Sequence, residues 1–366
     1  MRIKLSATFG VVALLVVAAC GGGSSDTDDA AETPKSGLYA DHDALVAAAE
    51  KEGKVKVLTS MTEDAIPGIT EAWNKKYPNI ELDISEQTGD DDKRILLEIQ
   101  AGQSDVDNLH LSAESYNDYL PELEQFDLIE LIKDGVLDIP EEMVNPAHPN
   151  TMAAGSGIGA FSYNPKLLSD ADAPKNYDDL LKPEFKDRKF LIDIEPANLA
   201  SLGPAWGDEK LKEYANAVGK QEPIWARGDT VSLTAMAAGE YQLHAFSNYH
   251  SAYRVSLKAP DGIKIVLLEP IPVRLTQIES IRKDADHPAA ALLFLEHTAS
   301  QEVQDILDEF EPRQSSIFAE GSELNTLTAG KELSVVSWEE FPKLEGWESL
   351  IVKEWGFPQA QVKEKD

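Results

Sequence analysis

Two phenols and an imidazole lie close together in the stretch FSNYHSAYRV at residues 246–255. Tyr249 and His250 are adjacent, and Tyr253 would share a face with Tyr249 in a helix, because residues four apart lie above one another. Side chains of these types bind a metal ion, orient an organic ligand or fill a core. A phenol has an ordinary pKa of about 10 and ionises only beside a metal or another cation. The stretch therefore leaves three interpretations open.

Polar residues also follow several predicted strands, where the loops of an open α/β sheet and the first turns of its helices form ligand sites. Arg227 precedes a predicted helix and suits a carboxylate or a phosphate, or else pairs with Asp229. Thr59 and Ser60 either contact a ligand or cap the next helix. The candidate ligand-binding residues are Thr59, Ser60, Thr88, Ser112, Glu114, Asp193, Arg227, Thr230, Asn248, Tyr249, His250 and Tyr253.

Motifs typical of catalysis or of cofactor binding are absent from the sequence. It has no P-loop, no GxSxG motif and no pair of histidines at the spacing of a zinc site. With 65 acidic residues, carboxylates are too numerous for any one pair to indicate acid–base chemistry. We therefore expect a protein that is not an enzyme and needs no cofactor, with no metal unless Tyr249 and His250 bind one.

Composition limits the class of partner. The 65 acidic residues stand against 33 Lys and Arg, so the formal net charge is -32. Such a surface repels phosphate backbones, which argues against a nucleic-acid partner, and it is typical of a soluble body. The length of 366 residues, 42% of them hydrophobic, suits about two domains. We expect a monomer that binds a small-molecule solute.

The N-terminus has the pattern of an export signal. In residues 1–19, two basic residues precede an apolar run at 9–19, which is too short to remain as a membrane-spanning helix. Two alanines stand directly before Cys20, the single cysteine, and VAAC resembles the lipobox of bacterial lipoproteins. This resemblance implies cleavage before Cys20 and attachment of lipid, palmitate included, to its sulfur; an ordinary signal peptide is the alternative. Residues 20–38 are predicted to be a flexible tether.

Beyond the tether, helical and strand patterns alternate, which predicts βαβ units and a parallel sheet. The segment 262–281 is extended and carries two prolines, so we expect a crossing segment and not one central strand. We expect residues 287–307 to be helical throughout, and a helix at 62–78 to begin with Thr62 as its N-cap. Further helices are predicted at 40–53, 90–102, 208–221 and 230–239, a turn and helix at 174–185, and strands at 54–60, 80–85, 105–114, 157–164 and 188–196.

Several segments in order resemble the extracellular solute-binding proteins of ABC importers, most closely the ferric-iron-type group. The resemblance covers about residues 50–320. It rests on EGKVKVLTS, EAWNKKYP, LLEIQAGQSDVDNL, GIGAFSYNPKLL, NYDDLLKPEFKDRKFLIDIEP, MAAGEYQLHAFSNY, HPAAALLFLEHTASQEVQ and EPRQSS, which follow one another from residue 52 to residue 316.

The resemblance implies an α/β, two-lobe type II periplasmic-binding-protein-like fold. Each lobe would be a mainly parallel sheet flanked by helices, and crossing hinge strands would join the lobes. It implies a solute held in the cleft between lobes, closure by hinge motion and delivery to ABC permease subunits. With the lipobox, it places the protein on the cell membrane through a lipid anchor, facing the periplasm or the cell exterior. The expected lobes are 39–153 with 272–312, and 154–271 with 313–366.

The same resemblance bears on the ligand. Ferric-binding relatives usually have two adjacent tyrosines, whereas here His250 follows Tyr249. A small organic or oxyanionic solute stacked on Tyr249 is therefore the favoured ligand, and a ferric ion bound by Tyr249 and His250 is the alternative. A surface-anchored hydrolase is the remaining class of function, and the sequence shows no nucleophile–base pair for it.

Overall fold

The computed structural model describes residues 37–87, 91–112, 115–310 and 314–356. Cys20 and the signal segment, Thr88 and Glu114 lie outside the described residues, and so does all but the end of the tether predicted at 20–38.

A mixed sheet forms the centre of the described body. Its strands follow the order β2-β1-β3-β9-β4-β7-β5-β6, with β10 paired to β9 and β8 paired to β4. Within β2-β1-β3 and β7-β5-β6 the pairing is parallel, whereas β4 and β9 run antiparallel to each other and to β7 and β3 respectively. The strands are β1 (Lys54–Thr59), β2 (Glu81–Glu86), β3 (Asn108–Leu111), β4 (Thr151–Tyr163), β5 (Leu191–Asp193), β6 (Ile224–Ala226), β7 (Leu243–Asn248), β8 (Lys264–Val266), β9 (Ile271–Ile281) and β10 (Leu333–Val336).

Helices flank this sheet, which confirms the predicted α/β class. Local signals set several of their ends: the Asp41 side chain accepts from the Ala44 N–H, and Gly53 ends the first helix in the left-handed region at φ 74°. The helices are α1 (His42–Glu52), α2 (Ile66–Lys76), α3 (Asp92–Gln100), α4 (Tyr116–Tyr119), α5 (Leu128–Lys133), α6 (Ala197–Ala200), α7 (Gly203–Gly219), α8 (Asp229–Ala238), α9 (Tyr249–Lys258), α10 (Pro288–Ala299), α11 (Gln301–Phe310), α12 (Glu323–Thr328) and α13 (Leu344–Trp355).

Two large hydrophobic clusters divide the body into halves. The first half surrounds β1, β2 and α10, and buries Trp73 and Phe294. Helix α10 is apolar on every side and is buried from Ala289 onward, as a helix inside a core must be. The second half surrounds β5, β7, α7 and α13, where the Tyr177 and Phe246 rings stack with centroids 5.7 Å apart. Each half therefore has its own core.

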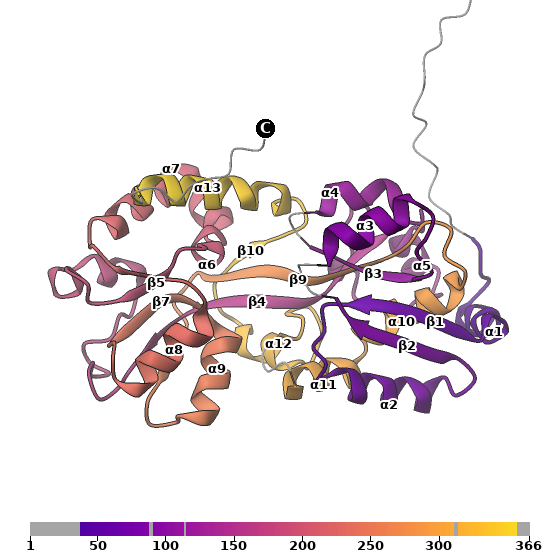
Figure 1. Cartoon of the computed structure of the whole chain (residues 1–366), viewed down its shortest axis with the longest axis horizontal. Coiled ribbons are helices and arrows are strands. Elements are labelled where there is room, and N and C mark those ends of the chain that lie inside the picture. The colour runs from indigo at the N-terminus through magenta and orange to yellow at the C-terminus, as the bar shows by residue number, and fades with distance from the viewer. Residues whose placement is uncertain (1–36, 88–90, 113–114, 311–313, 357–366) are drawn as a thin grey trace, which may run out of the picture. The chain divides into compact units, whose positions relative to one another are not determined.

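Strands β4 and β9 join the two halves (Figure 1). They run side by side through the middle of the described body, with β1, β2 and β3 on one side and β5 and β7 on the other. Their register extends from Thr151 opposite Ser280 to Ile158 opposite Val273. Beyond that pair, β4 continues with β7 and β8 in the second half. The chain passes between halves mainly through these strands.

Three predictions for individual elements were wrong. Thr62 does not cap α2, because its carbonyl accepts from the Ala65 and Ile66 N–H groups in a preceding turn, and the proline of IPG occupies the first turn of the helix. The helix predicted at 287–307 is two helices, separated by Ser300 in an extended conformation with ψ 149°. The turn and helix expected at 174–185 are two short 3₁₀ helices.

The segment 262–281 also differs from its prediction. It is two strands, and the second, β9, is central in the sheet as well as crossing between halves. Its proline, Pro272, is tolerated because the β4 ladder ends at the pair of Ile158 and Val273, which leaves Pro272 one residue outside that ladder. The missing N–H of Pro272 therefore costs that ladder no hydrogen bond.

Candidate functional site

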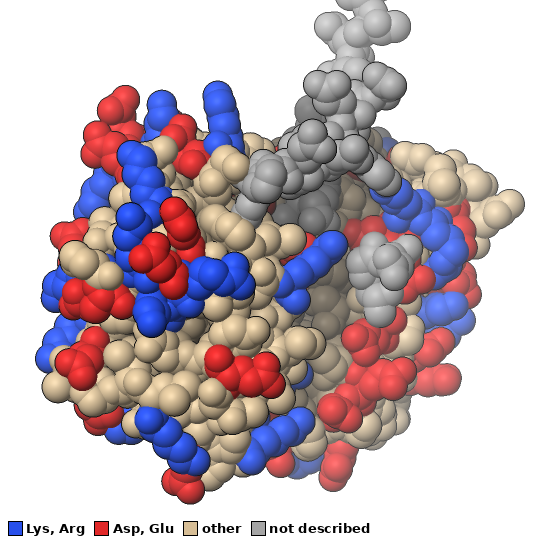
Figure 2. All heavy atoms as spheres, turned by 60° about the vertical axis from the view of Figure 1, so that its left-hand side comes forward, with Lys and Arg blue, Asp and Glu red and all other residues tan. Residues whose placement is uncertain are grey.

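A cavity of about 370 Å³ lies over the middle of β9, where strand ends of both halves meet. The outer surface is hollowed on the face that Figure 2 shows, with basic and acidic side chains on its rim. Helix α13 and the segment before it close one side of the cavity. The lining residues are Ser60, His110, Leu111, Ser112, Ala197, Arg274, Leu275, Thr276, Gln277, Ile278, Gln314, Phe341, Leu344 and Glu348.

The cavity has a cationic end, formed by Arg274 of β9. Its guanidinium donates to the amide oxygen of Asn198 in α6 and, at 2.6 Å, to that of Asn248 at the end of β7. A Cβ on Gly157 of β4 would lie 3.1 Å from the guanidinium carbon, so the side chain lies close against the backbone at a glycine. Two amides and a glycine thus hold the charged group in one place.

Burial lowers the pKa of Arg274, and the negative charges of Asp229 and Glu348 partly oppose that effect. Neither carboxylate is within ion-pair distance of the guanidinium, and no ion pair joins Arg274 to any described residue. Asp229 instead accepts from the backbone N–H of Asn248 and lies 3.4 Å from His244. Arg274 is therefore a cation held mainly by neutral groups.

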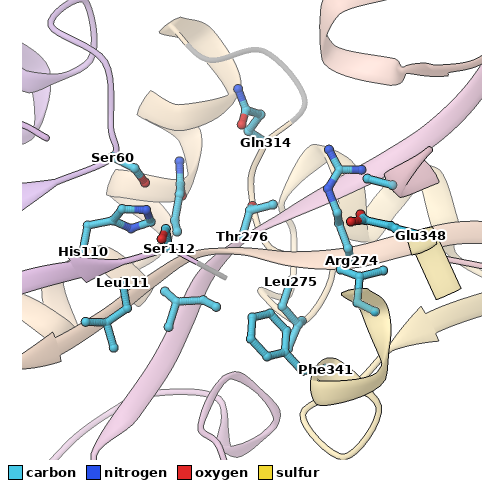
Figure 3. Close-up of a pocket in the computed structure, with 14 residues that line it drawn as sticks. Ser60, His110, Leu111, Ser112, Arg274, Leu275, Thr276, Gln314, Phe341 and Glu348 are labelled. Carbon is cyan, nitrogen blue, oxygen red and sulfur yellow. The ribbon is translucent and has the colours of Figure 1, made fainter. Parts of the chain in front are cut away.

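The opposite end of the cavity is polar and neutral (Figure 3). Ser60, His110 and Ser112, which follow or end β1 and β3, lie together there, and Thr276 lies between them and Arg274. Burial lowers the pKa of His110 to about 4, so this imidazole is uncharged near neutral pH. The Nδ1 atom of His110 and the hydroxyl of Thr276 are buried and have no hydrogen-bond partner among the described residues.

Ser60 and Ser112 were predicted to contact a ligand, and both line this cavity. Thr59 points elsewhere: it is fully buried, and its hydroxyl donates to Glu279 at 2.7 Å. The Ser112 hydroxyl lies 2.6 Å from that of Ser115, so it is already engaged within its own loop. The first half therefore contributes Ser60 and Ser112 to the cavity lining, whereas Thr59 is buried outside it.

The candidates at the ends of β5 and β6 lie outside the cavity lining. Asp193 accepts from the N–H of Gly228, which orders the loop before α8. Arg227 is exposed and lies 3.4 Å from Glu195, and Thr230 is exposed as well. The structure thus places the arginine predicted from sequence on the surface, and a different arginine in the cavity.

The residues at the start of α9 lie near Arg274. Asn248 binds the guanidinium directly, and the positive charges of Arg274 and Arg254 add to burial in lowering the pKa of His250 to about 3. Tyr249 and Tyr253 stack with centroids 6.4 Å apart, as their spacing predicted. Tyr249 also packs against a hydrophobic cluster and does not line the cavity.

Solved structures share this fold. An iron- and citrate-bound FutA of Trichodesmium matches with a TM-score of 0.66 and 17% identity, over 82% of this chain and 99% of that one. Ferric iron-binding protein A of Mannheimia haemolytica matches with a TM-score of 0.66 and 17% identity, over 83% of this chain and 100% of that one. AfuA of Actinobacillus pleuropneumoniae, with fructose-6-phosphate bound, matches with a TM-score of 0.57 and 16% identity, over 83% of this chain and 97% of that one.

The chain has the fold of the two-lobe periplasmic binding proteins. The expected type II fold is therefore confirmed. No family model and no curated protein sequence matches the chain. We expect the two lobes of this fold to correspond to the halves described above, and the lobe boundaries stay a prediction.

Within the described ranges, this periplasmic-binding-protein fold has no group of three or more His, Cys, Asp and Glu side chains placed to hold a metal. Nor is any helix of these ranges both long and apolar enough to cross a bilayer.

Arg274, His110 and Thr276 were missed by the sequence reasoning. One signal for two of them was present: Arg274 and Thr276 interrupt the otherwise apolar run IPVRLTQI at a spacing of two, which places both on one face of a strand. No local signal joined them to His110, which lies 164 positions earlier in the chain than Arg274.

Proposed function

We propose that the protein is a lipid-anchored extracellular solute-binding protein of an ABC importer. It captures a small organic or oxyanionic solute between its two lobes and delivers it to permease subunits, with no chemical step of its own. The observation that carries this proposal is the cavity at the strand ends of both lobes, with Arg274 at one end and neutral polar groups at the other.

The position of the cavity supports capture by closure. Ser60 and His110 belong to the first lobe, and the guanidinium of Arg274 is held by Asn198 and Asn248 of the second. A solute that contacts both ends links the lobes, so that binding favours the closed arrangement. The matched structures support this proposal, since they hold iron with citrate or fructose-6-phosphate.

Ferric iron is the alternative ligand, through Tyr249 and His250. The charge of Arg274 disfavours it, because the guanidinium already lowers the pKa of His250 and repels a trivalent cation as it repels a proton. The hydrolase alternative lacks support, since no hydrogen bond joins either serine hydroxyl of the lining to His110, and the Ser112 hydroxyl lies against that of Ser115 instead. An organic or oxyanionic solute therefore fits the site best.

A thermal-shift screen tests this function. The protein is unfolded and refolded to remove bound solute, then heated with ferric ion, ferric citrate, citrate, carboxylates, phosphate esters and neutral sugars. A solute present at a hundred times its dissociation constant adds about 2.7 kcal/mol to the free energy of unfolding, which is a clear shift in Tm. We expect an anionic solute to stabilise the protein and ferric ion to leave it unchanged.

The control is a surface variant, Lys353→Gln, which should respond to every compound as the native chain does. Stabilisation by ferric ion without citrate, lost in Tyr249→Phe, would establish the metal alternative instead. If no compound of any class shifts Tm, while ester or phosphate hydrolysis is detected, the solute-binding proposal fails.

A further inference from the structure

The cavity lining includes one cation, Arg274, which forms no ion pair with any described residue. Arg274 has five N–H donors, and the hydrogen bonds of its guanidinium go to two neutral oxygens, those of Asn198 and Asn248. Placing a cation away from water is costly unless an anion compensates it. The remaining donors border a cavity that has room for such an anion.

The surroundings of Arg274 fix its position and do not neutralise it. Asn198 also donates to the Phe246 carbonyl and to Asn248, so both amides that hold the guanidinium are themselves held. Gly157 lets the side chain lie close to β4, where a methyl group would stand 3.1 Å from the guanidinium carbon. A rigid fork of N–H donors in this setting is the arrangement that binds carboxylate and phosphate groups.

The polar groups at the opposite end of the cavity from Arg274 carry no charge. The Ser60 hydroxyl makes no hydrogen bond within the described residues, and the Thr276 hydroxyl and Nδ1 of His110 are buried without partners. Hydroxyl groups of a solute match them, because a hydroxyl both donates and accepts. Leu275 and Phe341 also line the cavity and supply apolar surface for a carbon skeleton.

We propose that the solute is a small hydroxylated organic anion, with its carboxylate or phosphate on Arg274 and its hydroxyls on Ser60, His110 and Thr276. This inference rests on the proposed solute-binding function and specifies the class of solute. Glu348 also lines the cavity near Arg274.

Matched ligand pairs test the class. Calorimetric titrations of the refolded, ligand-free protein compare gluconate with sorbitol and glucose 6-phosphate with glucose, which differ in the anionic group. Gluconate is also compared with hexanoate, which lacks the hydroxyls. We expect at least one of the two hydroxylated anions to bind below millimolar concentration, and its neutral or hydroxyl-free counterpart to bind at least about tenfold more weakly. The better anion of the two identifies a carboxylate or a phosphate as the group on Arg274.

Variants then test the residue. Arg274→Gln is expected to lower the affinity for the hydroxylated anion by about a hundredfold. The affinity for neutral sugars should not change, since only the positive charge and the fork of N–H donors are removed. Arg274→Lys keeps the charge without the fork, so a loss of about tenfold is expected, and it serves as the second variant if Arg274→Gln fails to fold. Arg254→Gln is the matched control, because this exposed arginine of α9 lies outside the cavity lining and should leave affinity unchanged.

The outcomes distinguish a failure of this inference from a failure of the proposed solute-binding function. The inference is overturned if the Arg274→Gln variant still binds the anion as the native chain does. It is also overturned if neither hydroxylated anion binds the native chain at ten millimolar. If neutral sugars or ferric ion bind instead, the chain remains a solute-binding protein and only the class of solute is wrong. If no small molecule of the earlier screen binds either, both proposals fail together.

Discussion

At the scale of single residues, the most perturbed carboxyl group is Glu279 of β9. It is fully buried, and burial raises its pKa to about 8, while the hydrogen bond from Thr59 acts in the opposite direction. The folded protein therefore keeps this carboxyl protonated at neutral pH, whereas the unfolded chain ionises it near its ordinary value of about 4.3. Glu279 thus couples folding to pH.

Replacing Glu279 by glutamine tests this coupling. Below the unfolded pKa both states hold the proton; between that value and about pH 8 only the folded state does, so stability is lost as the pH rises. The free energy of unfolding of the native chain should fall relative to Glu279→Gln by about 1.4 kcal/mol per pH unit in this window. Urea titrations at pH 5.5, 6.5 and 7.5 measure the difference.

A second variant tests whether the Thr59 hydroxyl lowers the pKa of Glu279. Thr59→Val removes the hydroxyl that lowers the pKa of Glu279, so the loss of stability should extend to a higher pH than in the native chain. Parallel stability curves for the native chain and Glu279→Gln would show that the carboxyl is ionised in the folded state.

At the scale of elements, the packing of α7 against α13 shapes one wall of the cavity. Gly203 at the start of α7 faces the Trp347 ring, where a Cβ would come within 2.4 Å of the ring. The Trp347 indole N–H donates to Asp208 of α7 at 2.8 Å, which holds the ring in place. Leu344 and Glu348 of the same helix α13 line the cavity. Small residues in α7 therefore determine where α13 lies.

Two glycine-to-alanine changes separate crowding from helix propensity. Gly203→Ala forces the Trp347 ring to move and should lower the free energy of unfolding by about 1–3 kcal/mol, as overpacking does. Gly346→Ala, in α13 with no atom within 4 Å of the added methyl group, should raise it by up to about 1 kcal/mol. Urea unfolding measures both. Equal changes in the free energy of unfolding would contradict the close packing of α7 on α13. Of the two variants, only Gly203→Ala should also weaken solute binding.

At the scale of the whole molecule, the proposal joins a binding body to a membrane anchor. The signal segment and Cys20 lie outside the described residues, so the anchor rests on the lipobox resemblance of the sequence. A lipid on the N-terminus would keep a solute-binding body close to its permease, which raises the local concentration of loaded protein there.

Cys20→Ala tests the anchor. The native chain should sediment with membranes and partition into detergent, because acyl chains bury many methylene groups in the bilayer. The variant should be released in soluble form with its solute affinity unchanged, while Ser24→Ala, four residues further on, should remain attached. Cell fractionation and labelling with a palmitate analogue measure both. A Cys20→Ala chain that still sediments with membranes would remove the lipid anchor from the proposal.

Much of the architecture was predictable from the sequence because its signals are local. Gly53 ends α1, alternating apolar residues mark β1, and tyrosines four apart stack in α9. The prediction of one helix at 287–307 failed because no glycine or proline marks the break at Ser300. Without such a residue, a sequence pattern does not show a break in the backbone.

The candidate site was predictable only in part. Ser60 and Ser112 were found because the strand-end rule depends on the order of elements along the chain. Arg227 was predicted because it precedes a helix, whereas the structure shows Arg227 exposed beside Glu195 and Arg274 in the cavity. Which of two arginines is desolvated depends on residues that surround it in space, and these are far away in sequence.

The sequence by itself determined the alternation of helices and strands, the lipobox at Cys20 and the acidic surface, since each depends on neighbouring residues or on composition. The tertiary structure decided which polar groups share a cavity. Arg274 meets Asn198, 76 positions away, and Asn248, 26 positions away. Burial and the lack of an ion pair with any described carboxylate, on which the proposed role of Arg274 rests, are properties of that assembled environment.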